Sequence, residues 1–335
     1  MEIIETIKKS PNNIYLEIKE TVEKRVGIHL NNPIPLNLGY LNLKWKVETG
    51  EKRYVIKQIS KERYKHRDFE KVVLEQDIAL HEQVRQYKNG TLCPNLLMYN
   101  RNVVHKTTSG ERFIMMEHME GNNLLPGTLN ENQMYSLGVM TAKMHNISND
   151  GTYGKEGNPK FVPPSIEKRL KHWETLYDKM KENYALMALI EKQLKATEHF
   201  NLDIISSSEP GWAHRDLWVD NLLFNEDELS AILDFDRFAF DYPELDIARA
   251  IMSGALKDMA FQPNVARAFL TGYRTNRGLE KGTFVRSLYL LWYLESTWWV
   301  VPNFNKERYQ EVQFQNEMTW IAEHLSDLTT MFKDW

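Results

Sequence analysis

Apolar residues follow a helical spacing near the start of the chain and a strand spacing soon after it. Four of them recur every four positions: Ile14, Ile18, Val22 and Val26. This spacing predicts an amphipathic helix. Residues 43–47 then alternate between apolar and polar, which is typical of a half-buried strand. A turn at residues 49–51 leads into a second predicted strand, residues 53–59.

A second helix and two further strands are predicted before the chain changes character near Gly121. Residues 69–87 carry apolar side chains at helical spacing. Residues 102–106 and 113–117 are the two predicted strands. Together with the preceding elements they indicate a small antiparallel sheet accompanied by two helices.

The rest of the chain is predicted to be mostly helical, with one short island of strands at residues 212–235. We therefore predict an α+β fold with two lobes. Residues 1–118 form the smaller lobe, with the opening helix, the sheet and a glutamate-bearing helix. Residues 119–335 form a larger helical lobe in which a hairpin and a substrate pocket are embedded.

Composition narrows the class of protein. The 335 residues carry a formal charge of −4, with 42% hydrophobic and 26% charged residues, as expected of a soluble globular protein. A nucleic-acid binder would need a basic excess. Because Cys93 is the single cysteine and no stretch has the ~20 apolar residues that span a bilayer, we expect a cytoplasmic protein without a membrane or nucleic-acid partner. The sequence leaves the oligomeric state open.

The strand island carries the residues with the most specific spacing. Asp216 and Asn221 lie five positions apart in one predicted loop, and Asp234 follows on the next hairpin strand. Phosphoryl transfer from ATP needs one carboxylate that orients the incoming hydroxyl and oxygen ligands that hold magnesium against the phosphates. Singly, each of these residues is also typical of an ordinary turn. Their order and spacing together favour a phosphotransfer site.

These motifs, His-Arg-Asp followed by Asn and then Asp-Phe-Asp, resemble the kinase-like phosphotransferase superfamily. The resemblance is strongest to its small-molecule branch, which includes aminoglycoside phosphotransferases, choline kinases and type II homoserine kinases. It implies a protein-kinase-like fold in which Asp216 is the catalytic base. It further implies that Asn221 and Asp234 bind Mg²⁺, and that His214 and Arg215 support the catalytic loop.

The same resemblance assigns ATP-binding residues in the first lobe. Lys57, on a predicted strand, would reach the phosphates and pair with Glu75 of the following helix. Residues 113–121 look like the hinge between the lobes. There the backbone groups of Glu117 and Met119 would bind adenine, and Met116 would line the pocket.

The sequence departs from the family pattern at several positions. The phosphate-covering loop, residues 38–42, holds one glycine rather than several. Trp218 stands where protein kinases favour lysine, and Asp236 replaces the glycine of Asp-Phe-Gly. The next helix is predicted to begin near Pro243, which leaves no room for a long activation segment. These features favour a small-molecule kinase over a protein kinase.

Some roles stay open at this point. Asp236 could bind a second magnesium, bind substrate or cap the hairpin. Trp218 and Glu295 are candidates for lining the substrate pocket, since aromatic faces and a carboxylate suit an organic cation, although tryptophan at helical spacing is usually core.

We predict an ATP- and Mg²⁺-dependent phosphotransferase that acts on a hydroxyl of a small molecule. The acceptor is an aminoglycoside, an amino alcohol, a hydroxy amino acid or a sugar. The alternatives are a catalytically weak structural protein of the spore-coat type, which the sparse glycine loop would suit, and a protein kinase.

Overall fold

The computed structural model describes residues 9–36, 42–152, 157–180, 182–302, 304–305 and 307–335. The chain divides into two compact units, Met1–Glu120 and Gly121–Trp335. The division predicted from the sequence lies between residues 118 and 119. No helix of the described residues combines the length and the apolar content needed to cross a bilayer.

The first unit is built around an antiparallel sheet with strand order β1-β2-β3-β5-β4. Its strands are β1 (Asn31–Pro35), β2 (Lys44–Thr49), β3 (Lys52–Ile59), β4 (His105–Lys106) and β5 (Arg112–Glu117). Its helices are α1 (Pro11–Val26), α2 (Phe69–Lys88) and a short 3-10 turn, Glu62–Tyr64.

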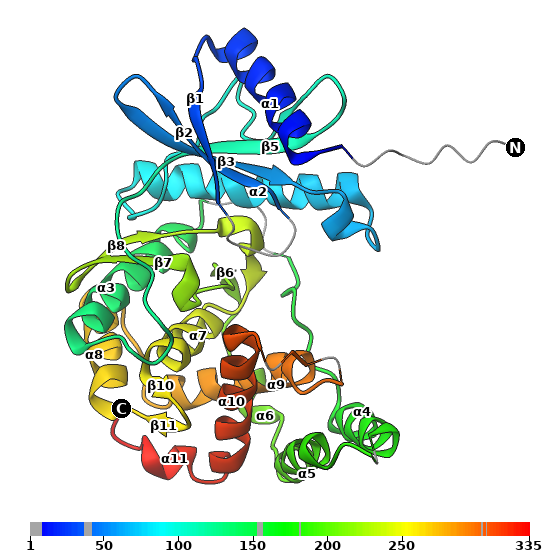
Figure 1. Ribbon diagram of the computed structural model, residues 1–335. Coiled ribbons are helices and arrows are strands. Elements are labelled where there is room, and N and C mark those ends of the chain that lie inside the picture. The colour runs from blue at the N-terminus through cyan, green and yellow to red at the C-terminus, as the bar shows by residue number, and fades with distance from the viewer. Residues whose placement is uncertain (1–8, 37–41, 153–156, 181, 303, 306) are drawn as a thin grey trace, which may run out of the picture. The chain divides into compact units, whose positions relative to one another are not determined.

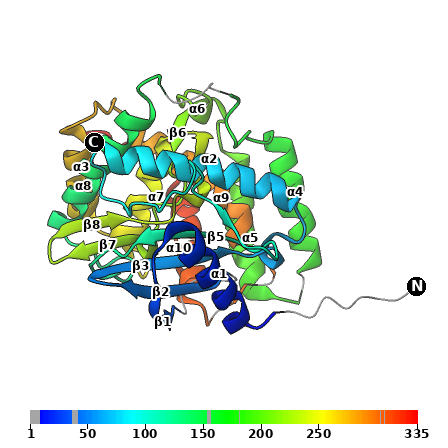
Figure 2. The same ribbon diagram turned by 90° about the horizontal axis from the view of Figure 1, so that it is seen from above.

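The two helices cover opposite faces of this sheet (Figures 1 and 2). Because side chains alternate along a strand, neighbouring residues serve different layers. Ile56 and Phe113 pack with α1, whereas Ile59 and Ile114 pack with α2. Lys57 therefore lies on the face that α2 covers.

The predicted helices and strands of this unit are confirmed, with two differences. Strand β1 was not predicted, because its five residues are all exposed and two of them are proline. Such a strand carries no apolar alternation, and proline is confined to sheet edges. The strand predicted at residues 102–106 is reduced to β4, since residues 99–102 form a turn instead.

The second unit is mostly helical. Its helices are α3 (Glu131–Ser148), α4 (Ile166–Lys179), α5 (Tyr184–Glu198), α6 (Asp203–Ser206), α7 (Glu244–Ala255), α8 (Pro263–Arg274), α9 (Thr283–Trp299), α10 (Tyr309–His324) and α11 (Leu328–Met331). Its strands form three antiparallel pairs: β6 (Gly211–Ala213) with β9 (Ala239–Asp241), β7 (Leu222–Asn225) with β8 (Glu228–Ile232), and β10 (Leu256–Lys257) with β11 (Ala260–Phe261).

The predicted strand island is confirmed as β6, β7 and β8, with the turn between the last two where it was expected. Strand β9 and the β10–β11 hairpin were not predicted, because two- and three-residue strands are too short to show a period. Helix α7 begins directly after Pro243, as predicted.

Helices α3 and α8 lie side by side in both views (Figures 1 and 2). Two glycines allow this close approach. A Cβ atom at Gly138 would overlap the Phe269 carbonyl, and one at Gly272 would overlap the Tyr135 carbonyl. The crossing brings His145 of α3 next to Tyr273 of α8.

Candidate active site

The hairpin β7–β8 brings Asn221 and Asp234 to one end. Leu222 pairs with Ile232, so the residue before β7 and the residues after β8 are neighbours. The Leu233 N–H accordingly donates a hydrogen bond to the Asn221 carbonyl at 2.8 Å. The predicted catalytic loop, residues 214–221, connects β6 to β7 and ends at this point.

Asp246, in the first turn of α7, holds the start of the loop. The backbone N–H groups of His214 and Arg215 donate to its two carboxylate oxygens, each at 2.7 Å. His145 Nε2 lies 3.0 Å from Oδ2. The carboxylate is fully buried, and its place near a helix N-terminus favours its negative charge.

His145 is a buried neutral link between Asp246 and Tyr273. Its Nδ1 lies 2.9 Å from the Tyr273 hydroxyl. Burial lowers the pKa of the imidazole, and the hydrogen bond to Asp246 only partly opposes this shift. A neutral ring can donate from Nε2 to Asp246 and accept at Nδ1 from tyrosine.

The loop is also tied to the strand end that carries Asp234. His214 Nε2 donates to the Leu233 carbonyl at 3.1 Å. Asn221 Nδ2 donates to the Asp216 carbonyl at 2.9 Å, which turns the Asn221 side-chain oxygen away from that carbonyl. Asp216, Asn221 and Asp234 are thereby held in one network.

Two residues of this network have left-handed backbone conformations. Arg215 has φ 66° and Asp234 has φ 62°. Residues other than glycine rarely adopt this region, and such strain concentrates at functional sites. The Arg215 N–H donates to Asp246, and the Leu233 carbonyl next to Asp234 accepts from His214.

Arg215 fixes the catalytic loop through hydrogen bonds of its guanidinium group. Its Nε donates to Asp241 Oδ2 at 2.6 Å, and Nη1 reaches the Arg237 carbonyl at 3.4 Å. The other oxygen of Asp241 accepts from the Phe161 N–H. A buried ion pair with these extra hydrogen bonds fixes the residue that precedes Asp216.

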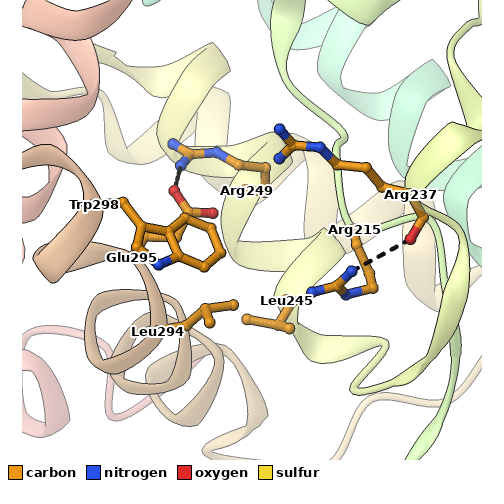
Figure 3. A pocket seen from close by; sticks show the side chains of 7 residues that line it. All are labelled: Arg215, Arg237, Leu245, Arg249, Leu294, Glu295 and Trp298. Atoms are coloured by element: carbon orange, nitrogen blue, oxygen red, sulfur yellow. Dashed lines mark hydrogen bonds and ion pairs between the residues drawn. The ribbon is translucent and has the colours of Figure 1, made fainter. Parts of the chain in front are cut away.

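Arg237 is a site residue that the sequence analysis missed. Its Nε lies 3.7 Å from Asp216 Oδ2. Together with Arg215 it lines a small pocket (Figure 3) that also includes Leu245, Arg249, Leu294, Glu295 and Trp298. The only sequence signal was an arginine directly after Asp236.

The two residues predicted to line a substrate pocket lie in different surroundings. Glu295 lines the small pocket of Figure 3 and accepts hydrogen bonds from Arg249 Nη1 at 2.7 Å and Trp299 Nε1 at 3.0 Å. Its role toward a substrate stays a prediction. Trp218 is not among the lining side chains; it is buried against Phe314, with ring centroids 4.3 Å apart. Arg249 connects both residues, because its guanidinium also lies 5.5 Å from the Trp218 ring centroid.

Arg249 lies between two carboxylates. It forms an ion pair with Glu295 and another with Glu317 of α10. Burial lowers the pKa of the guanidinium, whereas the carboxylates of Glu295 and Asp216 raise it. Arginine keeps its charge in proteins, so one guanidinium is shared here by two carboxyl groups.

The donor set at the hairpin end suits magnesium rather than a metal with a full protein cage. Asn221 and Asp234 offer an amide and a carboxylate oxygen, and Mg²⁺ is usually held by one or two such groups plus phosphates and water. Among the described residues there is no group of three or more His, Cys, Asp or Glu side chains that could hold a metal ion.

In the first unit, Lys57 is 3% exposed on β3 and faces the layer of α2, the helix that carries Glu75. Glu75 forms an ion pair with Arg67 at 3.0 Å. The pairing of Lys57 with Glu75 stays a prediction. The phosphate-covering loop predicted at residues 38–42 lies, apart from Asn42, outside the described residues.

The predicted hinge begins at the end of β5. Met116 pairs with Val55 of β3, and the Glu117 N–H donates to the Asn95 carbonyl at 2.9 Å. The backbone of Met119 has no hydrogen-bond partner among the described residues. A role of these residues in adenine binding stays a prediction.

A family model described as "Phosphotransferase enzyme family" matches residues 33–284, which include most of each unit. The chain belongs to the phosphotransferase enzyme family. The resemblance drawn from the sequence motifs is therefore confirmed.

The curated relatives of this phosphotransferase include several homoserine kinases. One from Rhodopseudomonas palustris (strain BisA53) is 27% identical over 220 residues, which are 63% of each chain. Another from Agrobacterium fabrum is 30% identical over 115 residues, 32% of this chain and 35% of that protein. The chain thus spans about 63% of the length of the first of them.

Solved structures share the fold at low identity. A spectinomycin phosphotransferase crystallised with ADP and spectinomycin has a TM-score of 0.62 at 13% identity, covering 92% of this chain and 98% of that one. A microcompartment-associated aminopropanol kinase has a TM-score of 0.57 at 16% identity, covering 93% and 98%. The predicted kinase-like α+β fold is confirmed.

Proposed function

We propose that the protein transfers the γ-phosphoryl group of ATP to a hydroxyl of a small molecule. One observation carries this proposal: the loop that contains Asp216 and Asn221 is held by the buried Asp246, and it ends beside the segment after β8 that carries Asp234. These three residues supply the set of oxygen groups that phosphoryl transfer requires.

In this reaction Asp216 accepts a hydrogen bond from the acceptor hydroxyl. The acceptor oxygen forms a bond to the γ-phosphorus while the bond from that phosphorus to the bridging oxygen of ADP breaks. The hydroxyl proton passes to Asp216 and then to solvent. Because the transition state is loose, the loop contributes mainly by positioning the hydroxyl and the phosphate.

Asn221 and Asp234 would hold Mg²⁺, which would neutralise the charge that develops on the phosphates. By the family resemblance, Lys57, supported by Glu75, would contact phosphates of ATP. The adenine would bind at Met116, Glu117 and Met119. These nucleotide and metal roles rest on the family resemblance and on the placement of each residue within its own unit.

Two alternatives are less well supported. A structural protein without turnover has no need for the hydrogen bonds that fix Asp216 and Asn221. A protein kinase would need an activation segment, but residues 235–243 between Asp234 and α7 are occupied by a 3-10 turn and β9. A small-molecule acceptor therefore fits best.

An acceptor screen tests the proposal. ADP release from Mg-ATP is measured in the presence of L-homoserine, amino alcohols, sugars and aminoglycosides, each at millimolar concentration. We expect at least one class to raise ADP release well above the rate without acceptor, with a matching phosphorylated product in the mass spectrum. Absence of any product across all four classes would contradict the proposed function.

A further inference from the structure

The first turn of α10 contacts the catalytic loop between the proposed base Asp216 and the proposed metal ligand Asn221. The Tyr309 hydroxyl donates to Asp220 Oδ1 at 2.8 Å, and Gln310 Nε2 donates to Asp220 Oδ2 at 3.3 Å. One helix therefore engages both oxygens of this carboxylate. Because Asp220 directly precedes Asn221, a contact that fixes Asp220 also limits where Asn221 lies.

Phe314 of the same helix contacts a second residue of the loop. Its ring lies against the buried Trp218, with ring centroids 4.3 Å apart, and against Trp299 of α9, with centroids 4.2 Å apart. Phe314 follows Gln310 by four positions, so the two side chains lie on the same face of α10. Helix α10 thus meets the loop at Trp218 and again at Asp220, on the side chains of both residues.

Helix α10 is anchored independently of the loop. Gln313 Nε2 donates to the Leu256 carbonyl of β10 at 2.9 Å, and Glu317 forms an ion pair with Arg249 of α7. Gln313 and Glu317 are both buried. These contacts fix the helix to the core of the second unit, so α10 is a support on which the loop rests.

The backbone on either side of Asn221 is held from another direction. Asn123 Nδ2 donates to the Asp220 carbonyl at 2.8 Å and to the Leu222 carbonyl at 3.0 Å. The Asn221 side chain uses its own Nδ2 on the Asp216 carbonyl. Its Oδ1 is thus the atom left to bind a metal, and the place of that oxygen depends on contacts that both neighbours of Asn221 make.

We propose that Tyr309 is a positioning residue of the phosphotransfer site: by holding Asp220, it fixes Asn221 where its oxygen can bind Mg²⁺. This inference rests on the proposed phosphotransfer function and extends that site to α10. Asp220 acts through Asn221 rather than on the substrate, because α10 takes both oxygens of its carboxylate. Residues that orient a metal ligand in this way affect metal affinity without touching the metal.

Nucleotide binding tests this role without an acceptor. Titration calorimetry gives the dissociation constant of ATP with Mg²⁺ and of ATP with EDTA, and the ratio of the two constants measures the contribution of the metal. In the wild type we expect Mg-ATP to bind more tightly than metal-free ATP. Tyr309→Phe is expected to lower this metal contribution roughly three- to tenfold, as for the loss of one partly exposed hydrogen bond, with the affinity for metal-free ATP unchanged.

Two substitutions of Asp220 separate its hydrogen bond from its charge. Asp220→Asn keeps an oxygen that accepts from Tyr309, so it should keep most of the metal contribution. Asp220→Ala should lose at least as much as Tyr309→Phe, and the double variant should lose no more than Asp220→Ala, because both changes remove one shared contact.

Tyr135→Phe is the matched control. Tyr135 of α3 is 43% exposed, close to the 46% of Tyr309. Its hydroxyl has no hydrogen-bond partner within the described ranges, so this variant should bind both forms of ATP as the wild type does. Thermal melting checks that each variant is folded. Gln310→Leu removes the other contact to Asp220 and provides the same test if Tyr309→Phe does not fold.

The two dissociation constants distinguish the possible failures. A metal contribution in folded Tyr309→Phe equal to that of the wild type would overturn the inference and leave the phosphotransfer function standing. An equal rise of both constants would show a general effect on the nucleotide site, which also contradicts a role through Asn221. A loss in Asp220→Asn as large as in Asp220→Ala would assign the effect to the charge of Asp220 and not to Tyr309. Absence of Mg-ATP binding in the wild type would contradict the proposed function itself.

Discussion

Asp246 links the residues of the catalytic loop to the helical core. Its two oxygens accept from the backbone of His214 and Arg215, and its position is set by His145. Removing the carboxylate would leave buried N–H groups without partners, at a cost of about 1–3 kcal/mol each. The residue therefore acts through the geometry of the loop rather than on the substrate.

His145 predicts a pH dependence of stability. Its pKa is lowered in the folded protein, chiefly by burial, whereas the unfolded chain has the ordinary value of about 6.5. Below that pH the unfolded state binds the proton first, so stability present at neutral pH is lost on acidification through the folded pKa. We expect urea unfolding to show a smaller loss of stability from about pH 7 to about pH 5 in His145→Gln than in the wild type.

The comparison between the two proteins isolates this one residue. His105, His118 and His172 also have lowered pKa values, but they contribute equally to both proteins. If stability against urea falls equally with pH in the variant and in the wild type, protonation of His145 does not cause the loss of stability, which contradicts the prediction.

At the scale of elements, the crossing of α3 and α8 positions His145, which contacts Asp246, the residue that holds the catalytic loop. Gly138 and Gly272 allow the two backbones to touch, and Tyr273 then reaches His145. Helix α10 holds the other end of the loop, where the Tyr309 hydroxyl donates to Asp220 at 2.8 Å.

Gly138→Ala is expected to destabilise the protein by about 1–3 kcal/mol, because the added methyl group meets the Phe269 carbonyl and forces the helices apart. Gly278→Ala is the control, since a Cβ there has open space around it. Urea unfolding followed by circular dichroism measures both. A midpoint for Gly138→Ala equal to that of the control would show that the crossing tolerates a side chain.

The sequence predicts the elements whose side chains follow a clear period. Helices α1 and α2 belong to this group because each buries one face, and strand β2 belongs to it because it buries alternate residues. Strands β3 and β5 were also predicted, although each buries several consecutive residues. Strand β1 is not predicted from the sequence because it is an exposed edge strand that contains proline. Strand β9 is not predicted because its three residues pair with β6, which lies far away in the chain. Pairing of this kind depends on tertiary contacts rather than on local pattern.

At the scale of the whole molecule, the order of motifs predicts two units, the loop that carries Asp216 and Asn221, and Asp234 on the following hairpin. It also names Glu295 as a candidate lining residue, but it does not predict the pocket that Glu295 shares with Arg237 and Arg249. The charged residues there come from four separate segments. Arg237 follows β8 and Arg249 lies on α7. Glu295 lies on α9 and Glu317 on α10. Charged residues on separate helices have no shared spacing, so their meeting is visible only in the fold.

The most direct test of the account is the rate of phosphoryl transfer in Asp216→Asn. Transfer from labelled γ-phosphate of ATP to the acceptor is followed in a single turnover, and Mg-ATP affinity is measured by titration calorimetry. We expect transfer to slow by about 10²–10⁴-fold, the usual contribution of a general base, with Mg-ATP affinity unchanged. Transfer by Asp216→Asn at the wild-type rate would contradict the central claim that Asp216 receives the acceptor hydroxyl.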